Sequence, residues 1–365
     1  MLKYLANLED LYGPLRVFDS ITFRAAVGMV VAFLAALAAG PGFIRLLKRL
    51  RVTENMDKPD SAELEKLHHL KRDTPTMGGI ILVCAIVVGG VLFADATSPY
   101  VWMTLVVLLA FATLGLVDDY VKLRRIRPGG LARPVKLIAQ FVLAAGACLM
   151  LCAFGDVRHV THLLVPGTKM AEFYPDLGAM YAPFFLLVLV GSSNAVNLSD
   201  GLDGLAAGLV ALVALTFTVL AYAAGHAEVS TYLRIPFVRH SGELTVLCAT
   251  VVGATLGFLW FNAHPARVFM GDTGSLGLGA AIGFAALSVK QELVLLVCGG
   301  VFVVEAVSVL LQIASCRTRG KRLLRCAPFH HHLEFSGWHE NHVVVRLWCI
   351  GIVLAALGLA SLKMH

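Results

Sequence analysis

Charged side chains are scarce in this chain. Only 15% of its 365 residues are Asp, Glu, Lys or Arg, whereas 58% are hydrophobic. Soluble domains carry roughly 25% charged residues, because their surface faces water. The composition therefore argues against a soluble globular protein. It predicts that lipid is the solvent for much of the surface.

The chain also lacks the cysteine pattern of a disulfide scaffold. None of its eight cysteines forms a C-x-x-C pair, and most lie inside apolar runs, where cysteine packs as a small apolar residue. The segment Met1–Thr22 carries three acidic residues and no small-residue cleavage site, so it does not resemble a cleaved signal peptide. No soluble segment or internal repeat stands out. The sequence predicts one integral membrane domain over residues 1–365.

Ten apolar segments predict an all-α, polytopic membrane protein. Each is close to the roughly 20 residues that a helix needs to cross about 30 Å of hydrocarbon. The segment at 275–289 is short and rich in glycine. The predicted spans are 21–46, 77–95, 100–117, 135–154, 182–199, 205–224, 243–261, 275–289, 293–314 and 343–362.

The basic residues are distributed unevenly between the connecting loops. Lys and Arg gather at 45–72, 122–136 and 317–325, in the first, third and ninth loops, whereas the second loop at 95–98 has none. An excess of Lys and Arg marks the cytoplasmic loops of membrane proteins. The odd-numbered loops are therefore predicted to be cytoplasmic. Both termini are predicted to be external, on the periplasmic side.

This topology brings the polar motifs to one face of the membrane. Asp118, Asp119, Asp200, Asp203 and Asp272 lie in or beside the third, fifth and seventh loops, and three consecutive histidines lie in the ninth. A carboxylate at membrane depth is costly unless it has a partner such as a cation. Carboxylates that converge on the cytoplasmic face predict a site there for a divalent metal and an anionic substrate.

Asp118 and Asp119 directly follow the apolar run 101–117. Acids are unfavourable at the carboxyl end of a helix, because the helix dipole is negative there. We therefore expect a compensating cation beside this pair. A solvated helix end is the plainer interpretation of the same two residues.

The segment Asn194–Leu205 combines amides, carboxylates and turn residues. Asn194 and Asn197 precede Asp200 at helical spacing, which places the three near one helix face. Such groups can hold a ribose, a phosphate–metal complex or a base edge. Asp200 and Asp203, each followed by glycine, also suit a plain turn between two helices.

The stretch Phe261–Ser275 predicts a tight polar loop followed by a helix. Asp272 stands just before the predicted helix, with Thr273 and Ser275 as candidate caps. A helix N-terminus favours phosphate, and an aspartate there can share a metal with it. Phe269 can stack on a base, although core packing is the simpler explanation. The glycines that follow predict close helix–helix approach rather than a dinucleotide site, because no βαβ unit surrounds them.

The histidines His330, His331 and His332 stand in the run Pro328–Glu334. They lack the i, i+4 spacing on a predicted helix that zinc sites use. Beside a phosphate they can donate hydrogen bonds and charge. A polar surface loop is the plainer interpretation.

Five stretches together resemble the polyprenyl-phosphate N-acetylhexosamine-1-phosphate transferase superfamily. They follow the order of that family along nearly the whole chain. The run Pro328–Glu334 looks like the branch that uses a MurNAc-pentapeptide donor rather than the N-acetylglucosamine branches. The five stretches are Thr74–Gly79, Asp118-Asp119, Asn194–Leu205, Asn262–Ser275 and Pro328–Glu334.

The resemblance implies a ten-helix fold with external termini, in agreement with the distribution of Lys and Arg, in the bacterial inner membrane. It implies a Mg²⁺-dependent phosphoglycosyl transferase of peptidoglycan synthesis. Phospho-MurNAc-pentapeptide would pass from UDP-MurNAc-pentapeptide to undecaprenyl phosphate, giving lipid I and UMP. A homodimer surrounded by membrane lipid is expected, and nucleic acid is not an expected partner.

The resemblance also implies roles for single residues. Asp272 leads the metal ligands, with Asp118, and either Asp118 or Asp119 acts on the lipid phosphate as base or as nucleophile. Positioning and electrostatics dominate phosphoryl transfer, so Lys71, Lys136 and His331 are expected on phosphate oxygens. The catalytic candidates are Asp118, Asp119, Asp272 and His331. The other candidates for substrate binding are Thr76, Asn194, Asn197, Asp200, Asp203, Asn262, Phe269, His330 and His332.

Two other functions fit parts of the sequence. A transferase of GlcNAc-1-phosphate from UDP-GlcNAc to a polyprenyl phosphate would share most of these motifs. A cation-coupled secondary transporter would also place acids at helix breaks. Transporter acids, however, lie near the bilayer midplane between inverted repeats. Here the acids gather at one face, and no repeat is evident.

Overall fold

A computed structural model of the chain describes residues 1–8, 13–50, 52, 74–124, 129–155, 160–165 and 174–363. Eight of its helices are long and apolar enough to cross a membrane, so the chain is an all-α polytopic membrane protein, as predicted. The described residues contain no β-strand, and an isolated bridge joins His162 to Asp176. The eight helices are α1 (Ile21–Arg49), α4 (Pro99–Leu123), α5 (Arg133–Phe154), α6 (Tyr181–Leu198), α7 (Leu205–Gly225), α9 (Leu244–Asn262), α12 (Gly300–Arg319) and α14 (Glu340–Ala360).

Two further helices complete the predicted set, and both are short. They are α3 (Gly79–Phe93), with 15 residues, and α10 (Gly271–Ser288), with 18 residues. The predicted span 293–314 is not one helix but two, α11 (Glu292–Cys298) and α12, which meet at Gly299. Gly299 and Gly300 stand side by side there, and glycine weakens a helix because its backbone has the most conformational freedom to lose.

The short elements lie at the two ends of these helices. They are the 3-10 helices η1 (Leu2–Leu8), η2 (Gly13–Asp19), η5 (Gly178–Met180), η6 (Ser241–Glu243) and η7 (Ser361–Lys363), and the α-helices α8 (Ala227–Leu233) and α13 (Phe329–Phe335).

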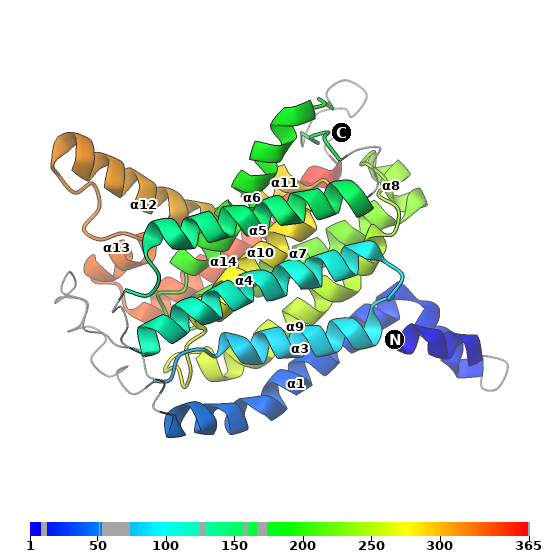
Figure 1. Cartoon of the computed structure of the whole chain (residues 1–365), viewed down its shortest axis with the longest axis horizontal. Helices are drawn as coiled ribbons and strands as arrows, with labels where there is room; N and C mark the ends of the chain where they lie inside the picture. Colours follow the sequence, from blue (N-terminus) through cyan, green and yellow to red (C-terminus); the bar gives the residue numbers. More distant parts are fainter. Residues whose placement is uncertain are drawn as a thin grey trace.

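Helices α9 and α10 occupy the centre of the bundle (Figure 1). α9 packs against α1, α3 and α7, and α10 packs against α4 and α6. Every residue of α10 from Thr273 to Ser288 is buried. Small residues make this possible, since a Cβ at Gly279 would collide with the Ser192 carbonyl oxygen of α6. The predicted role of the α10 glycines, close helix approach, is confirmed.

The outer helices turn apolar side chains outward. Within its apolar window α9 is 83% buried, but α5 only 28%. Ile138, Val142 and Leu149 on α5 are exposed. An exposed apolar stripe of this length suits contact with lipid chains, where water would oppose it.

Both termini lie at one end of the bundle, opposite the start of α10 (Figure 1). The Met1 ammonium donates to the carbonyls of Val91 and Leu92 at the end of α3, and the Lys363 ammonium donates to the Tyr232 hydroxyl. The two ends of the chain therefore share a side, in agreement with the predicted topology. Which side faces the cytoplasm stays a prediction from the basic loops.

A buried ion pair ties three elements together at this same end. Arg24 of α1 is fully buried and donates to both carboxylate oxygens of Glu243, at 2.6 and 2.7 Å, and to the Phe93 carbonyl. Glu243 also accepts the Asp95 N–H. Burial alone would raise the pKa of Asp95, but its hydrogen bonds to the Lys3 ammonium and to Thr97 lower it to about 2. This buried pair, with two hydrogen bonds between its side chains, fixes where α1, α3 and α9 begin or end.

We expect Glu243→Gln to lower the free energy of unfolding by about 3–5 kcal/mol, because the buried Arg24 guanidinium would lose its counter-charge. The measurement is the thermal unfolding midpoint of the purified protein in detergent. The double variant Arg24→Met, Glu243→Met should recover part of the loss, since it buries no unpaired charge. An unchanged midpoint for the single variant would contradict the role given to this pair.

Candidate active site

The carboxyl end of α4 and the start of α10 are pressed against each other. A Cβ at Gly115 of α4 would overlap the backbone of Asp272 in α10. Gly271, which precedes Asp272, has a φ of 72°, a left-handed conformation that glycine adopts readily. Two glycines thus allow the acidic end of α4 to reach the first turn of α10.

Asp119 caps α10 from the neighbouring helix. Its Oδ1 accepts the Asp272 N–H at 3.1 Å, and its Oδ2 accepts the N–H and hydroxyl of Thr273, at 3.0 and 2.8 Å. The first turn of a helix leaves N–H groups without partners, and a carboxylate is their best acceptor. The predicted start of this helix at 275 is wrong by four residues, because the cap comes from α4 and not from Thr273 or Ser275.

Asp272 lies between two lysines and an amide. Its Oδ2 accepts hydrogen bonds from Lys122 at 3.0 Å and from Lys136, and its Oδ1 accepts one from Asn197 at 2.9 Å. Asn197 also donates to the Ser275 hydroxyl. The structure therefore brings Asp272, Lys136 and Asn197 together from three different helices, and it adds Lys122.

Asp118 is the second carboxylate in contact with these lysines. Its Oδ2 lies 2.7 Å from Lys122 Nζ and 3.6 Å from Lys136 Nζ, and its Oδ1 accepts the Leu131 N–H. The compensating cation expected beside the Asp118-Asp119 pair is thus present as Lys122, one turn further along α4. The spacing of four residues between Asp118 and Lys122 is a local signal for this ion pair, whereas the sequence analysis uses Lys122 only for topology.

The three carboxylates can share a metal ion. One oxygen from each of Asp118, Asp119 and Asp272 lies within 4.8 Å of the others. Hard oxygen ligands of this kind suit Mg²⁺. If all five groups are ionised, three carboxylates and two lysines leave one net negative charge, so the local electrostatics favour a further cation.

The remaining amides of the predicted set support the loops. The Asn194 amide pairs with Gln140 of α5 and donates to the Val190 carbonyl. The buried Asn262 accepts the Gly204 N–H and donates to the Val268 carbonyl. Asn262 therefore ties the loop after α6 to the loop before α10.

The loop between α6 and α7 holds two predicted aspartates. Asp203 is buried and accepts the Ala266 N–H at 3.0 Å, and Asp200 is half-buried in the same loop.

The loop before α10 pairs with the segment before α3. Phe269 donates its N–H to the Pro75 carbonyl, and its own carbonyl accepts the Gly78 N–H. Thr76 lies between Pro75 and Gly78 along the chain. Phe269 itself is half-buried.

The histidine run is a short helix, α13, and not the surface loop that we considered. His330 is fully buried, and its Nδ1 lies 3.1 Å from Glu305 of α12. His331 pairs with Glu334 at 2.7 Å, and His332 accepts the Arg325 N–H. A Cβ at Gly201 would collide with the His330 ring, so α13 touches the loop that carries Asp200.

The structure places most of the predicted residues around one end of the bundle. Lys71 lies outside the described residues. Residues that the sequence did not single out are Lys122, Gln140, Glu305, His264 and Glu340. Apart from Lys122, each has its partner more than 20 positions away along the chain, and no local pattern signals such a contact.

Comparison with known proteins identifies the family of the chain. The family model for Glycosyl transferase family 4 matches residues 101–290, just over half of the chain, so the chain belongs to this class of transferase. A signature of phospho-N-acetylmuramoyl-pentapeptide-transferases matches residues 71–83. A phospho-N-acetylmuramoyl-pentapeptide-transferase from Citrifermentans bemidjiense is 46% identical over 363 residues, which is 99% of each chain. The chain therefore belongs to the phospho-N-acetylmuramoyl-pentapeptide-transferase family.

We expect Asp119→Ala to loosen the start of α10, because the N–H groups of Asp272 and Thr273 would lose their acceptor, at a cost of about 1–2 kcal/mol. Hydrogen–deuterium exchange of a peptide that covers 270–276 should become faster. The matched control Asp118→Ala removes a neighbouring carboxylate that accepts no α10 N–H, so exchange there should not change. Equal exchange in Asp119→Ala and the unmodified protein would show that another group caps this helix.

Proposed function

We propose that the charged cluster at the end of α4 and the start of α10 is the active site of a phosphoglycosyl transferase of peptidoglycan synthesis. Phospho-MurNAc-pentapeptide would pass there from UDP-MurNAc-pentapeptide to undecaprenyl phosphate. An oxygen of the lipid phosphate attacks the phosphorus bonded to the sugar, the diphosphate bond of the donor breaks, and UMP leaves. The observation that carries the proposal is Asp272 held between Lys122, Lys136 and Asn197 beside Asp118.

The two lysines address the main difficulty of this reaction, which is repulsion between two anionic reactants. Both ammonium groups point to one place, the Oδ2 atom of Asp272. Phosphate oxygens that enter this place would meet two cations already in position. Preorganised charge of this kind is the main means by which proteins accelerate phosphoryl transfer.

The carboxylates fit a Mg²⁺ ion, with Asp272 and Asp118 as the residues that would hold it. When bound, Mg²⁺ would polarise the donor diphosphate and neutralise part of its charge. Asp119 is less suited as a ligand, because both of its oxygens accept hydrogen bonds from α10.

The same contacts separate the roles of the paired aspartates. The Asp119 carboxylate caps α10, whereas Asp118 Oδ2 lies 2.7 Å from Lys122 Nζ. A phosphate monoester with a second pKa near 6 is mostly ionised at neutral pH, so the lipid phosphate needs little help from a base. These points favour direct attack, with Asp118 orienting the acceptor, over a covalent aspartyl intermediate.

The loops after α6 and before α10 offer a place for the nucleoside end of the donor. They carry Asp200 and Phe269, with Asn262 holding the two loops together. The ring of Phe269 is half-buried and is available to stack on uracil. Multi-pass insertion follows from the apolar helices, and we propose the bacterial inner membrane as its place. A homodimer stays a prediction of the family resemblance.

The two rival functions receive less support. The match to the phospho-N-acetylmuramoyl-pentapeptide-transferase signature favours the MurNAc-pentapeptide donor over UDP-GlcNAc. A transporter would need acids near the middle of its helices, but Asp118 and Asp272 stand at the end of α4 and the start of α10.

We expect Asp272→Asn to lower the rate of UMP release by at least about 10³-fold, because the variant removes the charge to which both lysines and the metal are directed. The measurement uses radiolabelled UDP-MurNAc-pentapeptide with undecaprenyl phosphate, with and without Mg²⁺. Asp176→Asn, the same change at the opposite end of the bundle, should retain the activity. Normal turnover by a folded Asp272→Asn protein would remove this residue from the mechanism.

Direct attack predicts that labelled UMP does not exchange into the donor when undecaprenyl phosphate is absent, because no enzyme-bound phospho-sugar forms. The assay incubates the protein with UDP-MurNAc-pentapeptide, labelled UMP and Mg²⁺, in detergent that contains no polyprenyl lipid. Adding the lipid product should restore exchange and serves as the positive control. Exchange without any lipid would instead establish a covalent intermediate.

A further inference from the structure

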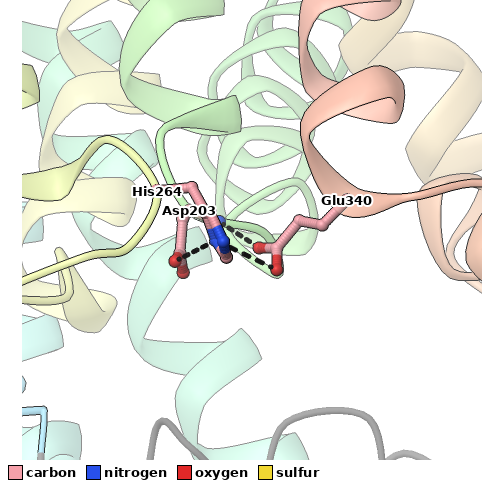
Figure 2. Close-up of side chains that lie close together, drawn as sticks. All are labelled: Asp203, His264 and Glu340. Carbon is pink, nitrogen blue, oxygen red and sulfur yellow. Dashed lines mark hydrogen bonds and ion pairs between the residues drawn. The ribbon is translucent and has the colours of Figure 1, made fainter.

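A second group of potential metal ligands lies beside the nucleoside loops. Asp203 belongs to the loop between α6 and α7, His264 to the loop between α9 and α10, and Glu340 to the first turn of α14. Figure 2 shows the three side chains converging from these elements. None of the three is part of the Asp118–Asp272 cluster, and two of them, His264 and Glu340, have no role in the proposed transfer.

The distances between the ligand atoms match a metal site. His264 Nδ1 lies 3.1 Å from Asp203 Oδ2 and 3.4 Å from Glu340 Oε2, and one such atom from each residue lies within 4.8 Å of the others. Ligands about 2.1 Å from a tetrahedral ion stand about 3.4 Å from one another. The two distances from His264 Nδ1 are therefore close to the edge length of a coordination tetrahedron.

A hydrogen bond from His264 accounts for only part of this arrangement. A single ring nitrogen, His264 Nδ1, faces two carboxylates, and it has at most one proton to donate. A divalent ion between a neutral imidazole and two carboxylates balances the charge of the three groups. Backbone N–H groups also orient both carboxylates, because Asp203 Oδ2 accepts the Ala266 N–H and Glu340 Oε1 accepts the Asp203 N–H. Metal-ligating carboxylates are held by such outer hydrogen bonds.

The site is open on its histidine side. The His264 side chain is 30% exposed, whereas those of Asp203 and Glu340 are 2% and 10% exposed. The His339 ring lies 6.4 Å from the His264 ring, and the exposed His342 follows 6.0 Å beyond His339. An ion can thus enter from solvent past three imidazoles, with the carboxylates at the inner end.

We propose that Asp203, His264 and Glu340 bind one divalent transition-metal ion of the Zn²⁺ class, separate from the Mg²⁺ expected at Asp272. One imidazole with two carboxylates is a ligand set that zinc uses, with a fourth position left for water. Magnesium prefers oxygen ligands and octahedral geometry, so the histidine selects against it. The ion joins the start of α14 to both loops that carry the nucleoside candidates, and it stabilises their arrangement.

The test uses the full-length protein in detergent, with any affinity tag removed and metals stripped by a chelator. Zn²⁺ alone is titrated, and binding is followed by calorimetry, by the thermal unfolding midpoint and by X-ray absorption at the zinc edge. We expect one strong site per chain, a raised midpoint and a first shell of nitrogen and oxygen atoms without sulfur. His264→Gln and Glu340→Gln should each weaken binding by at least about 100-fold, as the loss of a direct ligand requires.

Two further variants locate the ion. Asp272→Asn should bind Zn²⁺ as the unmodified protein does, and so should His240→Gln, which replaces an exposed histidine at the other end of the bundle. Absence of strong binding in the unmodified protein would overturn the proposal. So would binding that His264→Gln and Glu340→Gln leave unchanged, or binding that Asp272→Asn abolishes. None of these readouts depends on transferase activity.

Discussion

The contact between the Asp119 carboxylate and the first turn of α10 sets the geometry of the whole charged end. It fixes the position of α10 along the axis of α4, and it occupies both oxygens of Asp119. In this position the side chain of Asp272 reaches Lys122, Lys136 and Asn197. The absence of a side chain at Gly115 is part of the same constraint, since any Cβ there would displace the backbone of Asp272.

Lipid explains why a carboxylate from another helix supplies this cap. Near hydrocarbon, a backbone N–H without a partner costs several kcal/mol, and water is not at hand to satisfy it. A helix that begins inside the bundle, as α10 does, must find its acceptors among its neighbours. The same rule accounts for the opposite end, where Glu243 accepts from both Arg24 and the Asp95 backbone.

Much of the fold could be predicted because lipid imposes a simple rule on length and hydropathy, and all ten predicted segments contain helix. Boundaries set by distant residues could not be predicted. The start of α10 depends on Asp119, 153 positions away, and the Asp203–His264 contact joins residues 61 positions apart. The motifs predicted carboxylates that the structure brings together, but not their different contacts, because a carboxylate that caps a helix and one that can bind a metal look the same in the sequence.

The different roles of Asp118, Asp119 and Asp272 follow from which of their carboxylate oxygens already accept hydrogen bonds. Asp119 has both oxygens engaged by α10, and Asp118 has one engaged by the Leu131 N–H. Asp272 Oδ2 contacts both lysines, which are also the groups that a diphosphate would bind. Carboxylates and phosphates therefore compete for two ammonium groups, and three carboxylates already outnumber them. Added positive charge would favour substrate binding, which is the physical reason to expect a divalent cation at this end of the bundle.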